Sequence, residues 1–232
     1  MMENFLFIAL PYVALFLFFG GIFYRLFSGF KGSYRGKWDI TARGDLLWTT
    51  RSSGFFGRSS IGVASLNMHW GLLTLFIAHV VGFVGGAYGL TYLVDFFRWI
   101  GIVGGVMLLW GLLVALWRRI SNPRIRSMST FEDYAVLLFL LIITSLGMYQ
   151  SVIKGVFGVS YAVGPWLSSI LKFLPNATFS ASIPFTNKLH IIFALIFFSY
   201  FPFTKLVHSV TFPLSYLWRP YINFRRLQAL KR

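Results

Sequence analysis

The chain has 232 residues, of which 57% are hydrophobic, 20% aromatic and only 12% charged. A soluble domain averages about 25% charged residues, so this composition excludes a disordered chain and an ordinary soluble enzyme. There is no cysteine, which excludes disulfides, thiolate catalysis and cysteine-ligated zinc or iron–sulfur sites in this chain. The apolar residues come in long runs, which predicts an all-α integral membrane protein.

Five apolar stretches are long enough to cross a bilayer, because a spanning helix needs about 20 apolar residues. They cover residues 5–27, 63–86, 92–117, 132–155 and 187–211. The first stretch has no basic region before it and is too long for a signal peptide, so we interpret it as a retained helix. The sequence therefore predicts one membrane domain, a bundle of five transmembrane helices.

The net charge of +15 is spread unevenly over the loops, which marks cytoplasmic segments rather than nucleic-acid binding. Seventeen Lys and Arg residues fall on one predicted side and four on the other. The positive-inside rule then places the N-terminus outside the cell membrane and the C-terminus in the cytoplasm. Segment 28–62 becomes a cytoplasmic loop, 156–186 an outer loop and 212–232 a basic cytoplasmic tail. Within the outer loop, residues 166–174 are expected to form an amphipathic helix at the interface, with Trp166 in the interfacial aromatic belt.

All four histidines lie within or at the ends of two predicted spans: His69 and His79 on the second, His190 and His208 on the fifth. An ionisable residue inside a membrane is a functional hypothesis by default. The two helices run in opposite directions, so His79 and His190 pair toward the outer face, and His69 and His208 toward the inner face. Each pair suits a haem iron with both axial positions filled, which favours electron transfer. The alternative is a non-redox membrane anchor or transporter in which each histidine hydrogen-bonds a neighbouring helix.

Around these histidines the sequence resembles the gamma, or cytochrome b, subunit family of respiratory nitrate reductase. The resemblance is strongest in residues 52–82, 117–128 and 188–213. The residues that carry it are Ser52-Ser53, His69-Trp70-Gly71, His79, Phe201-Pro202-Phe203, Leu206-Val207-His208 and the loop from Arg118 to Arg126. The order and spacing of the histidines match this family.

The resemblance implies five transmembrane helices, two b-type haems and oxidation of a membrane quinol on the outer side. His79 and His190 would then ligate the outer haem, and His69 and His208 the inner haem. Electrons would pass from the outer to the inner haem, then to an iron–sulfur beta subunit and a molybdenum alpha subunit. A related cytochrome b serving another anaerobic reductase, of perchlorate, sulfur-compound or heterodisulfide type, is the alternative.

The family carries a lysine soon after its second helix that helps to bind quinol, and this sequence has none there. Arg98 and Lys188 are the candidates for that role, and each is alternatively an anchor at a helix end. Four arginines at the level of the inner haem are candidates for its propionates, since Arg pairs well with carboxylates. They are Arg118, Arg119, Arg124 and Arg126, which alternatively serve topology or contact the beta subunit.

Overall fold

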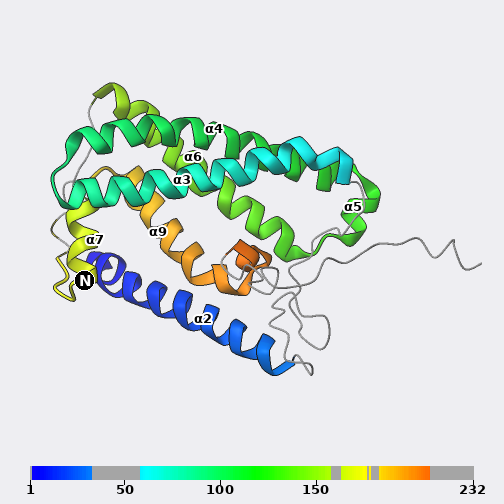
Figure 1. Ribbon diagram of the computed structural model, residues 1–232, viewed down its shortest axis with the longest axis horizontal. Coiled ribbons are helices and arrows are strands. Elements are labelled where there is room, and N and C mark those ends of the chain that lie inside the picture. Colours follow the sequence, from blue (N-terminus) through cyan, green and yellow to red (C-terminus); the bar gives the residue numbers. More distant parts are fainter. Residues whose placement is uncertain (1, 33–57, 158–162, 177, 179–182, 210–232) are drawn as a thin grey trace, which may run out of the picture.

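The computed structural model describes residues 2–32, 58–157, 163–176, 178 and 183–209. Within these ranges every regular element is a helix (Figure 1). Five helical stretches are long and apolar enough to cross a membrane: Phe5–Arg25, Gly62–Ala87, Thr91–Ser121, Phe131–Ile153 and Phe185–Phe203. The prediction of an all-α bundle of five transmembrane helices is confirmed.

The first span is helical throughout, from α1 (Met2–Asn4) through the π-helical η1 (Phe5–Ala9) to α2 (Leu10–Gly32). It continues beyond its predicted end at residue 27. The chain is next described at η2 (Arg58–Ile61), directly before the second span. Most of the predicted cytoplasmic loop, and the whole predicted tail, therefore lie outside the described residues.

The second and third spans form an antiparallel hairpin of α3 (Gly62–Ala87) and α4 (Thr91–Ser121), visible along the top of Figure 1. The short turn between them depends on Gly89, whose φ of +70° is left-handed and costs glycine little. The Leu90 N–H donates to the carbonyl of Gly85 at 2.7 Å, as in a Schellman helix end. Because the turn is short, α4 runs back antiparallel along α3.

Glycines bring α3 and α4 into close contact. A Cβ on Gly71 would lie 2.7 Å from the Gly104 carbonyl oxygen, and a Cβ on Gly111 would lie 2.8 Å from that of Ala64. Both distances are shorter than any real Cβ contact, so larger residues would force the helices apart. The main core, which includes the fully buried Leu112, lies where α4 meets α6.

A short helix, α5 (Pro123–Met128), leads the chain from α4 into α6 (Phe131–Phe157). The Asn122 side chain accepts two backbone N–H groups of α5 and so caps it. Thr130 and Asp133 cap α6, because the Thr130 N–H donates to Asp133 Oδ2 at 2.9 Å. These caps place the C-terminal end of α4 next to the N-terminal end of α6.

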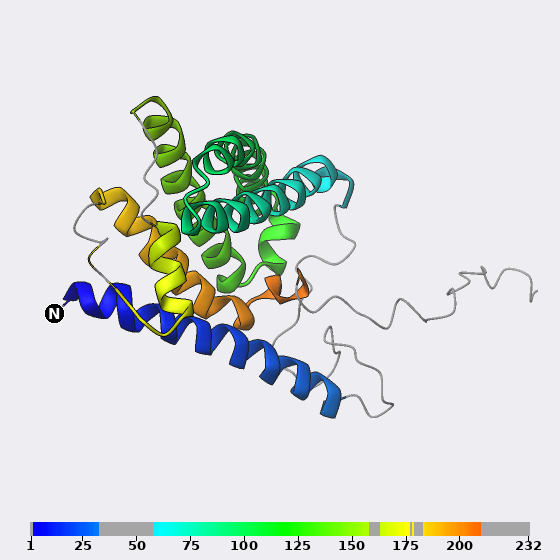
Figure 2. The same cartoon turned by 60° about the vertical axis from the view of Figure 1, so that its left-hand side comes forward.

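The helix predicted in the outer loop exists as α7 (Val163–Leu171), but its tryptophan is not in an aromatic belt. Trp166 is buried with Ile170 against Phe7 of the first span. Its indole N–H donates to the Phe7 carbonyl at 2.9 Å, and the Tyr12 hydroxyl donates to that of Ile170 at 3.0 Å. The apolar stripe of α7 thus packs on protein rather than lipid, a choice that the amphipathic pattern does not encode. Figure 2 shows α7 lying over α2.

The last span also differs from its predicted extent of 187–211. The α-helix α9 (Phe185–Tyr200) ends early and is followed by two short 3-10 helices, η3 (Phe201–Phe203) and η4 (Lys205–Ser209). Pro202 lies at this break, where its ring and missing N–H end an α-helix. α9 packs on α2 and α6, whereas α3 packs on α4 and α7.

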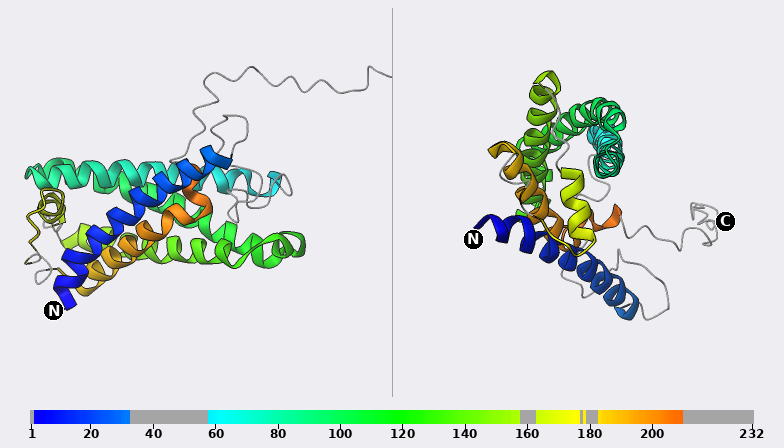
Figure 3. Two further views of the ribbon diagram at one scale, coloured as in Figure 1. Left: turned by 90° about the horizontal axis from the view of Figure 1, so that it is seen from below. Right: turned by 90° about the vertical axis from the view of Figure 1, so that its left-hand side faces the viewer.

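Successive spans run in opposite directions, so the ends of the helices lie in two groups (Figures 1 and 3). The N-terminus, the turn between α3 and α4, and α7 lie at one end, which we call the N-terminal end. α5 and the C-terminal part of α2 lie at the other, which we call the α5 end. Which end faces the cytoplasm stays a prediction from the charge pattern.

Candidate metal centre

Two histidines from different helices face each other toward the N-terminal end. His79 lies in the last third of α3, and His190 lies near the start of α9. Their ring centroids are 6.4 Å apart and their planes differ by 17°. The structure thus brings together the pair that the sequence predicts for the outer site.

Hydrogen bonds fix which nitrogen of each ring is available. The Nδ1 of His79 lies 2.7 Å from the carbonyl oxygen of Leu75, and that of His190 lies 3.0 Å from the carbonyl oxygen of Ile143. A carbonyl oxygen only accepts, so each Nδ1 carries the hydrogen. Each Nε2 then keeps its lone pair, which is the arrangement found in metal-ligating histidines.

The spacing of the two rings fits one metal ion between them. Two metal–imidazole bonds of about 2 Å, plus half of each ring, give a centroid separation of about 6 Å for opposed ligands. Among the described residues no cluster of three or more His, Asp or Glu could hold a bare metal ion. A porphyrin would supply four of the ligands of an iron and leave two positions for a pair of imidazoles, so the pair fits such a group.

The small residue Gly147 on α6 makes room for the His190 ring. A Cβ at Gly147 would lie 3.0 Å from His190 Cε1 and 3.5 Å from its Nδ1. The other histidine of the pair, His79, is contacted by Phe83, whose ring lies edge-on to it with the ring centroids 5.8 Å apart. Gly147 is not among the site residues predicted from the sequence, although an isolated glycine inside an apolar helix is a signal of close packing.

A second residue that the sequence analysis missed is Asn187, one turn before His190 on α9. Its side chain is only 7% exposed, and its Oδ1 has no hydrogen-bond partner among the described residues. A buried amide oxygen without a donor is costly, so its position beside the histidine pair is notable.

The predicted inner pair is described only in part. His69 lies on α3, exposed, with its Nδ1 2.7 Å from the Ser65 carbonyl oxygen. This repeats the hydrogen bond that His79 makes to the carbonyl oxygen four residues before it. His208 lies in η4, but its side chain is outside what the structure describes. The pairing of His69 with His208 stays a prediction.

Both quinol candidates have protein partners at the N-terminal end. Lys188 Nζ donates to Glu3 Oε1 at 2.7 Å. Arg98 donates from Nη1 to the Ser151 carbonyl at 3.4 Å and lies 4.9 Å from the Trp99 ring centroid.

The four candidate arginines for propionates fall into two groups. Arg118 is buried and donates to Ser60 Oγ at 2.9 Å, and Arg119 donates to Ser129 Oγ at 2.7 Å. Arg119 also faces the Asp133 carboxylate at 3.6 Å. The other two, Arg124 and Arg126, are exposed on α5. Only the exposed pair is thus open to a partner without rearrangement.

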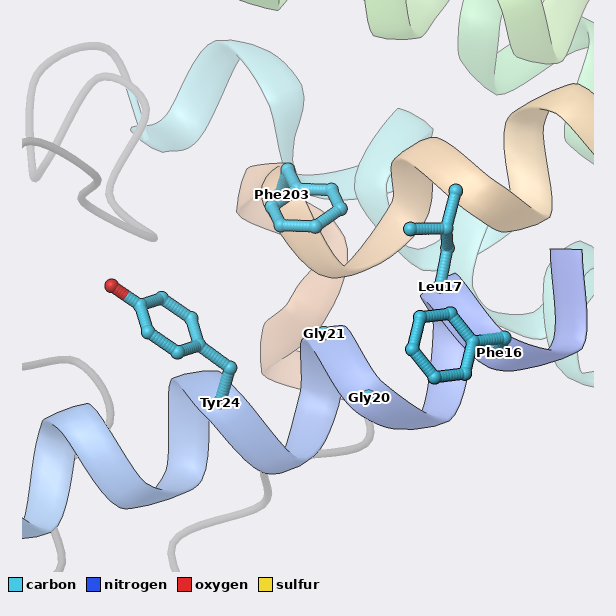
Figure 4. Close-up of a pocket in the computed structure, with 6 residues that line it drawn as sticks. All are labelled: Phe16, Leu17, Gly20, Gly21, Tyr24 and Phe203. Carbon is cyan, nitrogen blue, oxygen red and sulfur yellow. The ribbon is translucent and has the colours of Figure 1, made fainter. Parts of the chain in front are cut away.

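An apolar groove lies between α2 and η3 (Figure 4). It is lined by Phe16, Leu17, Gly20, Gly21, Tyr24 and Phe203. Among the described side chains, no histidine lines this groove.

The fold and the paired histidines define a class: a multi-pass membrane protein of five helices, in which two histidines from different helices lie with their ring centroids 6.4 Å apart. The family model for the nitrate reductase gamma subunit matches residues 3–227. The chain belongs to this family, as its sequence resemblance predicted.

Named relatives are similar in sequence to this chain over most of its length. The nitrate reductase gamma chain of Bacillus subtilis (strain 168) is 31% identical over 228 residues, covering 94% of this chain and 95% of that relative. The respiratory nitrate reductase 2 gamma chain of Escherichia coli (strain K12) is 28% identical, covering 81% and 88%. The nitrate reductase-like protein NarX of Mycobacterium tuberculosis is 28% identical, covering 79% of this chain but 30% of that longer protein.

Proposed function

We propose that this chain is the di-haem cytochrome b subunit that oxidises quinol and anchors a respiratory nitrate reductase in the cell membrane. It would pass electrons to an iron–sulfur subunit and a molybdenum subunit. The observation that carries the proposal is the opposed pair of His79 and His190, each with Nδ1 bound to a carbonyl and Nε2 available. Family membership supports the identity of the reductase.

The haem sites are assigned to the histidines as follows. His79 and His190 hold the outer iron, and His69 and His208 hold the inner one. A b-type haem with two imidazoles supplies one-electron transfer without an open coordination position. The carbonyls behind Nδ1 keep each ring oriented and raise the basicity of Nε2. The distribution of Lys and Arg supports an outer position for the first pair.

Quinol gives up two electrons and two protons, and the protons leave on the outer side. Arg98 and Lys188 are the basic candidates for its oxygens. Asn187 is a third candidate, since its buried Oδ1 accepts what a quinol hydroxyl donates. At the α5 end, Arg118, Arg119, Arg124 and Arg126 stay the candidates for the inner propionates, and the exposed Arg124 and Arg126 are open to them without rearrangement.

The soluble subunits would dock on the positive cytoplasmic surface. Arg124 and Arg126 are exposed on α5 and available for such a contact. Copurification identifies the partner. A nitrate-reducing molybdenum subunit supports the proposal, whereas a subunit of another anaerobic reductase would support the related cytochrome b alternative.

The first experiment is a reduced-minus-oxidised optical spectrum of the detergent-purified chain, with haem counted per polypeptide. We expect a sharp low-spin b-type α-band and two haems. His79→Ala should remove the outer haem alone and halve the band. Phe76→Ala, which removes an exposed aromatic ring from the same helix, is the matched control and should change neither haem. Folded protein that contains no haem, although haem was supplied during growth, would return the histidines to structural roles.

A further inference from the structure

The segment that carries His208 is not positioned by the helix before it. α9 ends at Tyr200, and Thr204 is extended with φ −100° and ψ 168° between the two 3-10 helices. An α-helix fixes the place of a residue by its regular rise, but here that regularity stops eight positions before the histidine. Something else must set the place of η4.

Lys205, the first residue of η4, is held by the first turn of α6. Its backbone N–H donates to Glu132 Oε1 at 2.9 Å, and its Nζ donates to Asp133 Oδ1 at 2.8 Å. One carboxylate thus fixes the backbone and the other fixes the side chain. Two bonds from one residue determine both position and direction at the start of η4.

The Asp133 carboxylate is itself immobile. Its side chain is 4% exposed and accepts from the Thr130 N–H at 2.9 Å and from the Thr130 hydroxyl at 3.1 Å. Arg119, at the end of α4, lies 3.6 Å from its Oδ1. The carboxylate therefore joins α4, α6 and η4 at a single buried point, and two cations compensate its charge.

The rest of η4 is also fixed toward the bundle. Val207 is fully buried, and the Leu206 N–H donates to Thr204 Oγ1 at 3.1 Å. Position 208 is one turn of 3-10 helix after Lys205, because such a helix has about three residues per turn. The anchor thus lies directly beside the predicted inner ligand in the chain.

We propose that Glu132 and Asp133 are positioning residues for the inner haem, which act by clamping Lys205 and so fixing the backbone that presents His208. The proposal rests on the proposed function, in which His208 is an axial ligand. Because Pro202 ends α9, the clamp replaces the helix as the element that sets the ligand. The outer ligand His190 has no such need, since it lies within α9 itself.

The test uses the purified full-length chain with haem supplied during growth. Lys205→Gln removes the bond to Asp133 but leaves the Thr130–Asp133 cap of α6 in place. Haem is counted by its pyridine adduct, and the two low-spin irons are resolved by redox titration and electron paramagnetic resonance. Lys172→Gln, the same change at an exposed lysine in the turn directly after α7, is the control.

We expect Lys205→Gln to weaken inner-haem binding by about 10- to 100-fold, as when a metal ligand loses an outer partner. The outer-haem signal should stay unchanged, and Lys205→Arg, which keeps a cation for Asp133, should restore the inner signal at least in part. A purely structural role would lower thermal stability and reduce both haems equally.

Wild-type occupancy, potential and spectrum of the inner haem in Lys205→Gln would overturn the clamp while leaving the proposed function intact. If the Lys205→Gln chain is not recovered folded, Glu132→Gln, which weakens the bond to the Lys205 backbone, tests the same prediction. A wild-type chain without any inner haem would instead overturn the proposed function, and the clamp with it.

Discussion

Adding one methyl group at Gly147 should disturb the outer haem without disturbing the fold. In Gly147→Ala the new Cβ lies 3.0 Å from His190 Cε1, whereas carbon atoms in contact prefer about 3.5–4.0 Å. The ring must therefore move by roughly half an ångström. Gly147 and Ile143 lie one helical turn apart on the same face of α6, so the ring also moves away from the Ile143 carbonyl.

The size of the effect follows from that hydrogen bond. Its length is now 3.0 Å, and a shift of this size stretches it to the limit of about 3.2–3.5 Å. Loss of an outer partner of a ligating histidine weakens metal binding by about 10- to 100-fold. Ala in place of Gly favours the helix itself by up to about 1 kcal/mol, so global stability should not fall.

The assay is the transfer of haem from the purified chain to excess apomyoglobin, followed optically. Gly147→Ala should release its outer haem faster by the same factor, while the inner haem leaves at the wild-type rate. Gly20→Ala is the matched control, because nothing lies within 4 Å of its added Cβ. Unchanged release in Gly147→Ala would refute the placement of His190 against α6, and with it the fit of this pair to a haem.

Three further substitutions test other contacts. Gly71→Ala should destabilise the chain by about 1–3 kcal/mol, because its Cβ would overlap the α4 backbone, and a thermal melt in detergent should show a lower midpoint. Trp166→Phe removes the hydrogen bond from the indole N–H to the Phe7 carbonyl and should cost about 0.5–1.5 kcal/mol in the same melt, whereas Trp110→Phe, at an exposed tryptophan, should change the midpoint little. Asn187→Leu should raise the melting midpoint, because it removes a buried oxygen that has no hydrogen-bond donor among the described residues. The same change should raise the KM for a soluble quinol by about 2- to 12-fold, which is the equivalent of one lost hydrogen bond of about 0.5–1.5 kcal/mol. An unchanged KM would exclude Asn187 from the quinol site.

The number of spans and the outer histidine pair were predictable because each depends on a pattern that is local in the sequence. Apolar runs define spans by length alone. Antiparallel neighbours then bring the late part of the second span to the early part of the fifth, which pairs His79 with His190 if the helices adjoin. The structure places the rings 6.4 Å apart although α3 packs mainly on α4 and α7.

The features that were not predictable depend on which face of a helix meets which neighbour. The apolar stripe of α7 has the same sequence pattern whether Trp166 contacts lipid or Phe7. Nothing in the sequence around Gly147 indicates a functional role until α6 is placed beside His190. In a membrane the hydrophobic effect does not distinguish protein from lipid, so periodicity carries less information about packing than in a soluble domain.

The end of α9 illustrates a different limit. Pro202 signals a break, but hydropathy continues past it, and the sequence alone favours a span that includes His208. What the chain does after the break is decided by Lys205 meeting Glu132 and Asp133, more than seventy positions earlier. The two acids lie at the start of a predicted helix, where carboxylates ordinarily favour the N-terminus of the helix dipole. Acids at the start of a helix are common, so the sequence does not single out these two. Their position nevertheless suits an anchor, because a capped first turn holds a carboxylate in a fixed place. The segments that carry the two proposed ligands are therefore positioned by different means: a continuous helix holds His190, and a buried ionic contact holds the backbone before His208.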